Sequence, residues 1–177
     1  PGPRQTAPDI LVIGAGGAGM YAAIAAAAAG AQVLLADQSL VGRGGATIMA
    51  QMTVAGALGE QHEDDWQRHF SDTVRAGRGL CNEELAGILC REAPERIREL
   101  DSWNVGWARD PQGRIHGVQA PGHNAARCVY VDFLATGPAI ARTLRNQVAR
   151  VKNVKRVSGL VIRDLVLDEG RVVGAVA

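Results

Sequence analysis

Two short clusters of β-branched residues and leucine near the start of the chain frame a segment made mostly of alanine and glycine. The clusters have the length of buried strands, and the alanine-rich segment between them favours a helix. The pattern therefore predicts a strand at residues 9–13, a helix at 20–29 that ends at Gly30, and a strand at 32–36. This uncharged run is long enough to cross a membrane, but five glycines interrupt it. We therefore expect no transmembrane segment.

Two longer stretches predict helices at residues 63–76 and 83–100, with Asn82 as the N-cap of the second. Pro94 is expected to kink or interrupt that second helix, because proline lacks a backbone N–H. The acidic run at residues 63–65 is expected in the first turn of the first helix. Negative charge there interacts favourably with the helix dipole.

The two ends of the chain differ in character. Residues 1–8 contain three prolines and no initiator methionine, which indicates a disordered or processed tail. Residues 160–167, the turn 168–170 and residues 171–177 have the pattern of a strand, a tight turn and a second strand. Because the last apolar run has no polar residue to end it, we expect these 177 residues to be a piece of a longer protein.

Composition narrows the class of protein. With 47% hydrophobic residues the chain can form a core, and its net charge of +1 gives no reason to expect nucleic-acid binding. The three cysteines are an odd number and include no Cys-x-x-Cys pair. We therefore expect neither a disulfide framework nor a metal site. The same cysteine usage fits a reducing compartment such as the cytoplasm.

The first predicted strand leads directly into a glycine-rich motif of the form G-x-G-x-x-G. The first glycine permits a sharp turn, the second lets a pyrophosphate approach the backbone, and the third lets the helix pack closely on the strands. The start of the helix offers free N–H groups to phosphates. Asp37, 18 residues after the motif, is placed to bind a ribose diol, which favours NAD or FAD over NADP. The motif residues are Gly14, Ala15, Gly16, Gly17, Ala18 and Gly19.

The segment after Asp37 separates the two dinucleotides. An NAD-binding unit usually continues into a helix and another strand, whereas residues 38–56 are rich in glycine and small residues. Such a loop can lay backbone N–H groups along a flat heteroaromatic ring. Its apolar residues, which include Ile48 and Met49, argue against a flexible loop that is fully exposed to water. The loop therefore favours FAD.

Several motifs in order resemble the flavoprotein subunit family of succinate dehydrogenase, fumarate reductase and L-aspartate oxidase. They are residues 9–36 followed by 44–51, the Gly-His…Arg segment at 122–127, the Thr-Gly…Leu helix at 136–144, and the strand pair at 161–174. The resemblance implies an α/β fold: a Rossmann-like FAD-binding domain with a parallel sheet, helices and a β-hairpin near its end. It further implies that residues 9–177 are the N-terminal portion of that domain, without the capping domain and the second half.

The resemblance also implies which residues bind FAD. Succinate dehydrogenases carry the flavin covalently on a histidine, and the matching position here is Ala46, so the FAD is expected to be non-covalent. Gln51 lies where family members approach flavin and substrate. The implied cofactor-binding residues are Gly14, Ala15, Gly16, Gly17, Ala18, Gly19, Asp37, Gln38, Ser39, Gly44, Gly45, Ala46, Thr47, Ala50, Gln51, Val161 and Ile162.

By the same resemblance, the enzyme exchanges a hydride between flavin and a small dicarboxylate-like substrate. The main catalytic groups are expected outside this chain, in the rest of the flavoprotein or in a partner subunit. The location is then the cytoplasm, or the face of the inner membrane through partner subunits. Two alternatives stay open: an NAD-dependent dehydrogenase domain, and a non-catalytic FAD-binding chain of a split flavoprotein.

The Gly/Pro-rich stretch at residues 106–127 carries further candidates. Its arginines and histidines can line a flavin cleft and attract a dicarboxylate. Alternatively, they are solvated or hydrogen-bonded to local carbonyls. For His123 the sequence favours neither alternative. His62 and His69 are expected on a solvated face, and Cys128 is expected to be buried in a strand. The other candidates of this stretch are Arg109, Arg114, His116 and Arg127.

Overall fold

The computed structural model describes residues 8–132 and 134–177. The predicted tail therefore lies almost entirely outside the described residues. The chain forms two compact units: unit 1 comprises residues 1–49 and 140–177, and unit 2 comprises residues 50–139. Within the described part, no helix combines the length and the apolar character that a membrane crossing requires.

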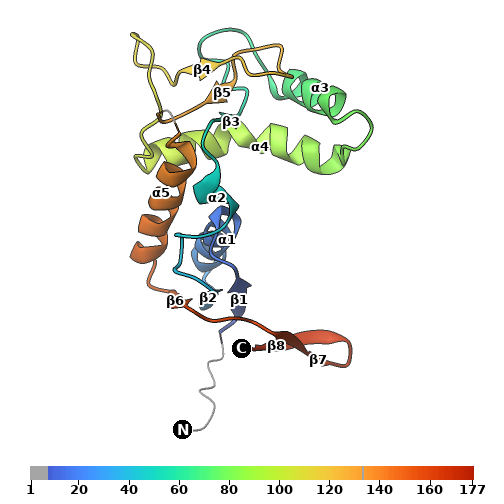
Figure 1. The fold of residues 1–177 in the computed structure, drawn as a ribbon, viewed down its shortest axis with the longest axis vertical. Helices are drawn as coiled ribbons and strands as arrows, with labels where there is room; N and C mark the ends of the chain where they lie inside the picture. Colours follow the sequence, from blue (N-terminus) through green and yellow to red (C-terminus); the bar gives the residue numbers. More distant parts are fainter. Residues whose placement is uncertain (1–7, 133) are drawn as a thin grey trace. The chain divides into compact units, whose positions relative to one another are not determined.

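Unit 1 is built on a three-stranded parallel sheet (Figure 1). Its strands are β1 (Ile10–Ile13), β2 (Val33–Asp37) and β6 (Val154–Ser158), in the order β1-β2-β6. Helix α1 (Gly17–Ala28) connects β1 to β2. The predicted strand–helix–strand unit is thus confirmed, although α1 begins three residues earlier than expected, at Gly17 rather than Met20.

Strand β6 was not anticipated, yet it pairs in parallel with β2 along its whole length, from Val33 opposite Val154 to Asp37 opposite Ser158. Helix α5 (Thr136–Arg150) precedes it in the chain. Met20 of α1, Leu35 of β2 and Val148 of α5 are fully buried in this unit. The alanines of α1 that face inward are small enough for the helix to approach the sheet closely.

The hairpin near the C-terminus is as predicted in type. Strands β7 (Asp164–Asp168) and β8 (Arg171–Val176) are antiparallel, and both turn residues, Glu169 and Gly170, have positive φ (Figure 1). The first strand begins at Asp164, four residues later than expected. Its side chains are exposed, Leu167 at 62%.

Unit 2 contains two helices that pack on each other, α3 (Trp66–Gly77) and α4 (Glu83–Ser102). Its small antiparallel sheet has the order β3-β5-β4, with β3 (Val54–Ala55), β4 (Gly117–Val118) and β5 (Cys128–Val129).

Two helix predictions in unit 2 need correction. Helix α4 is continuous through Pro94, so the expected interruption is wrong; its other backbone hydrogen bonds and its packing on α3 keep the helix intact. The acidic run lies before α3 rather than in its first turn. Asp65 is the N-cap and accepts the Arg68 N–H, and Asp64 is bound elsewhere.

Candidate functional site

The turn between β1 and α1 requires glycine at two positions. Gly14 has a φ of +95°, which favours a residue without a side chain, and its N–H donates to the Ala36 carbonyl at 2.7 Å. A Cβ at Gly19 would overlap the Gly14 carbonyl oxygen. The helix therefore starts directly against the turn that ends the strand, as the motif predicts.

The N-terminus of α1 is left without a side-chain cap, because its N-cap residue is Gly16. The Gly17 N–H donates to Thr47 Oγ1 at 2.9 Å. A Cβ built at Gly16 would meet only that same oxygen, at 4.0 Å. The first N–H groups of a helix have no intrahelical acceptor, so this surface fits the pyrophosphate of a dinucleotide.

Asp37 ends strand β2 beside this helix start. Its Oδ2 accepts the Ala15 N–H at 2.6 Å, and its Oδ1 accepts the N–H and the hydroxyl of Ser39 at 2.7 and 2.8 Å. Burial raises the pKa of Asp37, but the hydrogen bonds from Ala15 and Ser39 outweigh it, and the net pKa lies below the ordinary value. The ionised Oδ2 keeps acceptor capacity that a ribose hydroxyl can use.

The loop after β2 folds back onto the same turn. The Gly42 N–H donates to the Ala15 carbonyl at 3.1 Å, and the Val41 N–H donates to Ser158 Oγ at 3.2 Å. The loop then enters a short helix, α2 (Ala46–Met49), which was expected to be irregular. Ala46 is exposed and has no nucleophilic atom.

The segment after β6 meets the end of β2. The Gly159 N–H donates to the Ser39 carbonyl at 3.1 Å, and the Leu160 N–H donates to the Asp37 carbonyl at 2.9 Å. Unit 1 thus brings the glycine motif, residues 37–47 and residues 158–160 into one cradle, and the predicted Val161 and Ile162 follow directly in the chain. Ala50 and Gln51, also predicted as site residues, belong to unit 2.

Ser158 and Gly159 also belong to this cradle, but they were not predicted from the sequence. Without β6 in the predicted sheet, nothing placed them near Asp37. The β-branched Val154 and Val157 were the available signal, but the two charged residues between them break the alternation typical of a half-buried strand. The carboxyl ends of parallel strands meet at one edge of a sheet, so recognising the strand would have placed both residues.

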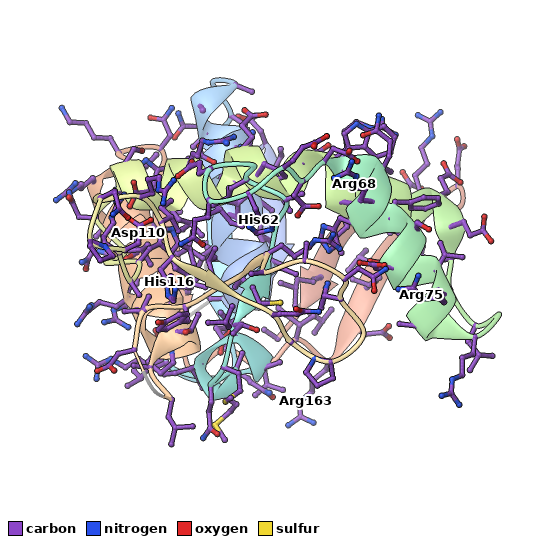
Figure 2. The ribbon with its side chains drawn as sticks, turned by 90° about the horizontal axis from the view of Figure 1, so that it is seen from above. His62, Arg68, Arg75, Asp110, His116 and Arg163 are labelled. Carbon is purple, nitrogen blue, oxygen red and sulfur yellow. The ribbon has the colours of Figure 1, made fainter. Side chains whose placement is uncertain are left out.

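Unit 2 contains a buried ion cluster centred on Arg127. The guanidinium binds Asp64 through two parallel hydrogen bonds of 2.9 Å and binds Asp72 Oδ2 at 2.7 Å. The side chains of Arg127, Asp64 and Asp72 are 1%, 2% and 3% exposed. Asp72 also accepts the Asn124 N–H at 2.8 Å and pairs with Arg75, which Figure 2 labels. Arg127 is therefore occupied by protein carboxylates.

Two histidines lie against this cluster. The rings of His69 and His123 have centroids 5.7 Å apart, and both Nδ1 atoms are buried and have no hydrogen-bond partner among the residues that the structure describes. Burial, and then the charge of Arg127, lower the pKa of His69 to about 4 and lower that of His123. His69 is 2% exposed, so its expected place on a solvated face is wrong. His62, labelled in Figure 2, is exposed as expected.

The remaining candidates of unit 2 are held by local contacts. Arg109 binds Asp101, Arg114 binds Asp110 at 2.7 Å, and His116 Nδ1 is 3.0 Å from the Tyr130 hydroxyl; Asp110 and His116 are labelled in Figure 2. Cys128 is buried in β5 as expected, and burial raises its pKa. Within residues 8–132 and 134–177, no group of three or more His, Cys, Asp or Glu side chains is arranged to hold a metal.

Comparison with known proteins shows to which family the chain belongs. The FAD binding domain family matches residues 9–177. The chain belongs to this family. The match covers the cradle and unit 2 together, and it decides between the two dinucleotides in favour of FAD.

The chain is similar to L-aspartate oxidases and to flavoprotein subunits of succinate dehydrogenase and fumarate reductase. The L-aspartate oxidase of Streptomyces coelicolor is 33% identical over 169 residues, which cover 95% of this chain and 28% of that protein. The succinate dehydrogenase flavoprotein subunit of Rickettsia conorii is 33% identical over 96% of this chain and 29% of its own length. The chain therefore spans less than a third of these relatives.

A solved structure confirms the fold class. The Sdh1 complex of Mycobacterium smegmatis in its apo form matches with a TM-score of 0.90 and 33% identity, over 95% of this chain and 30% of that one. The predicted α/β FAD-binding fold, the resemblance to these flavoenzymes and FAD as cofactor are thus confirmed. The individual FAD-binding residues stay predictions.

Proposed function

We propose that this FAD-binding domain holds FAD non-covalently in the cradle of unit 1 and serves a flavin-dependent oxidoreductase. The proposal rests above all on Asp37, whose carboxylate accepts the Ala15 N–H within the glycine turn and keeps Oδ2 available for a ribose hydroxyl. The start of α1 and Thr47 offer N–H and hydroxyl groups to the pyrophosphate.

The residues proposed to contact FAD share this cradle or the segment that follows it in sequence. Gly14–Gly19 would hold the pyrophosphate, and Asp37 with Ser39 would orient the ribose. The others, proposed from the resemblance, are Gln38, Gly44, Gly45, Ala46, Thr47, Ala50, Gln51, Val161 and Ile162. Because Ala46 offers no nucleophile, the attachment is proposed to be non-covalent.

We further propose hydride exchange between FAD and a small dicarboxylate-like substrate. FAD supplies the hydride-accepting chemistry when it is bound, and this chain would bind and orient it. Arg127, the most buried arginine of the candidates, is paired with two carboxylates and so leaves no free charge for a substrate. Substrate-binding and catalytic groups are therefore proposed to come from outside residues 1–177, either from the same polypeptide or from a partner subunit. The proposed location is the cytoplasm or the inner-membrane face, reached through such a partner.

The test uses the complete polypeptide that contains this chain. Purified protein should show flavin absorption bands, and the flavin should move to the supernatant after acid precipitation. Asp37→Ala should weaken FAD binding about tenfold, the size expected for a hydrogen bond to a charged acceptor. Asp168→Ala, at an exposed carboxylate of the hairpin, should leave the affinity unchanged.

Three results would contradict parts of this proposal. Flavin that stays with the precipitate would overturn non-covalent attachment. Equal affinity in the Asp37→Ala and wild-type proteins would overturn the assigned ribose contact. Failure of succinate, L-aspartate and other small dicarboxylates to bleach the flavin without oxygen would overturn the proposed substrate class.

A further inference from the structure

Arg145 of α5 is bound to the loop that closes the cradle. Its Nη1 donates to the Gly42 carbonyl at 3.2 Å. The side chain is half-buried, and within the described residues it makes no ion pair with any carboxylate. The guanidinium is therefore committed to a backbone carbonyl rather than to a charged partner.

Gly42 is held tightly at this point. The residue is buried, has a φ of +67°, and a Cβ there would lie 2.9 Å from Met20 Sδ and 3.2 Å from Arg145 Cβ. The Gly42 backbone is thus packed between α1 and α5. Neither helix can move away without loosening the loop.

The two peptide groups that flank the Gly42 Cα connect Arg145 to the glycine turn, because the Gly42 carbonyl accepts from Arg145 and the Gly42 N–H donates to the turn. Gly42 donates its own N–H to the Ala15 carbonyl, and the Ala15 N–H in turn donates to Asp37. A chain of three hydrogen bonds therefore runs from the Arg145 guanidinium through the loop and the turn to the proposed ribose-binding carboxylate.

We infer that Arg145 is a positioning residue for FAD: it holds the loop at residues 41–45 closed on the glycine turn and thereby sets the affinity for the dinucleotide. The inference rests on the proposed FAD site. It differs from a purely packing role because the hydrogen bond fixes the carbonyl of Gly42, the residue whose N–H donates to Ala15, whereas the apolar stem of Arg145 supplies only contact area.

The experiment measures FAD binding to the complete polypeptide, with flavin removed and then titrated back. Arg145→Met keeps the stem and removes the donors, and we expect roughly tenfold weaker binding, the size of one hydrogen bond from a charged donor. Arg145→Lys retains a charged donor and should recover most of the affinity. Arg142→Met, at an exposed arginine one turn earlier on α5, is the matched control and should bind as wild type.

The outcomes separate the possible failures. If wild-type protein binds FAD and Arg145→Met binds equally well, or if Arg142→Met loses as much affinity, the positioning role is overturned while the FAD site stands. If wild-type protein does not bind FAD, the proposed function itself fails, and this inference fails with it. A lower unfolding temperature of flavin-free Arg145→Met with unchanged affinity would assign the residue to packing alone. Should Arg145→Met not fold, Arg145→Gln, whose side-chain nitrogen ends two bonds short of the Arg145 Nη1 atom and is uncharged, carries the same expectation.

Discussion

Asp37 in unit 1 and Asp72 in unit 2 are similar carboxylates used in opposite ways. Each accepts an N–H from a residue far away in sequence, Ala15 and Asn124, and each has a lowered pKa because hydrogen bonds outweigh the effect of burial. Each carboxylate accepts three hydrogen bonds, but two of the donors to Asp72 are arginines and its side chain is only 3% exposed. Asp37 is half-buried, and within the described residues its three hydrogen bonds come from Ala15 and Ser39 rather than from a cation.

The difference shows how a ligand site can be told from a structural cluster. The positive charge of Arg127 made it a candidate for attracting a dicarboxylate, whereas the glycine motif is uncharged and offers backbone N–H groups. In a buried cluster, each charge must be matched or the cost of removing it from water is not offset. A charged group that stays accessible and has no opposite charge beside it is therefore the better sign of a binding site.

The largest expected effect is on stability, and it comes from removing Arg127 from the buried ion cluster of unit 2. Arg127→Met leaves Asp64 and Asp72 buried without their cation, and we expect a loss of about 3–5 kcal/mol in the free energy of unfolding. All three tryptophans, Trp66, Trp103 and Trp107, lie in unit 2. Urea unfolding followed by tryptophan fluorescence therefore reports this unit directly.

A matched change tests the contrast between the two carboxylates. Asp37→Ala should lower FAD affinity and leave the tryptophan transition in place. If Arg127→Met has no effect on that transition, the cluster is not a source of stability.

The second prediction compares two helical glycines, one in each unit. Gly19→Ala forces a Cβ into the Gly14 carbonyl, and we expect FAD binding to weaken about a hundredfold, which corresponds to about 2.7 kcal/mol. Gly87→Ala places its Cβ 3.8 Å from Phe70 Cε2, an ordinary contact. Because alanine is the better helix former, that variant should be more stable by up to about 1 kcal/mol.

Flavin titration and urea unfolding of both glycine variants provide the measurement. Normal FAD affinity in Gly19→Ala would show that the close approach of turn and helix is not needed for binding. A destabilised Gly87→Ala would show that the space beside Phe70 cannot take a methyl group.

The smallest effect concerns His69, which lies beside His123 at the buried ion cluster of unit 2. The folded pKa of His69 is about 4, below its ordinary value of 6.5, so the unfolded chain takes up a proton first as the pH falls. The stabilisation is fully present above pH 6.5 and is lost progressively down to about pH 4. Between pH 7 and pH 5.5 we expect a loss of about 1 kcal/mol in the free energy of unfolding.

Substitution identifies the group responsible for the pH dependence. His69→Gln should flatten it, and His62→Gln, at an exposed histidine, should leave it as in wild type. An equally steep loss in His69→Gln would assign it to other groups, His123 first among them, because its pKa is lowered in the same direction.

The local features of this fold were readable from the sequence. Clustering of β-branched residues predicted β1 and β2, the glycine motif predicted the turn before α1, and the Glu169–Gly170 turn predicted the hairpin. Each depends on residues near one another in the chain, where periodicity and turn chemistry act. The resemblance to flavoenzymes likewise rested on motifs that keep their order.

Only the tertiary structure decided what distant segments do together. It placed β6 beside β2 and so brought Ser158 and Gly159 to the cradle, and it joined Arg127 to Asp64, 63 positions away. It also showed that His69 is buried, although the sequence of its helix had suggested that this residue faces solvent. The local sequence pattern determines which helix or strand forms. The partner of a buried charge, by contrast, is the distant group whose interaction with it offsets the free-energy cost of removing that charge from water.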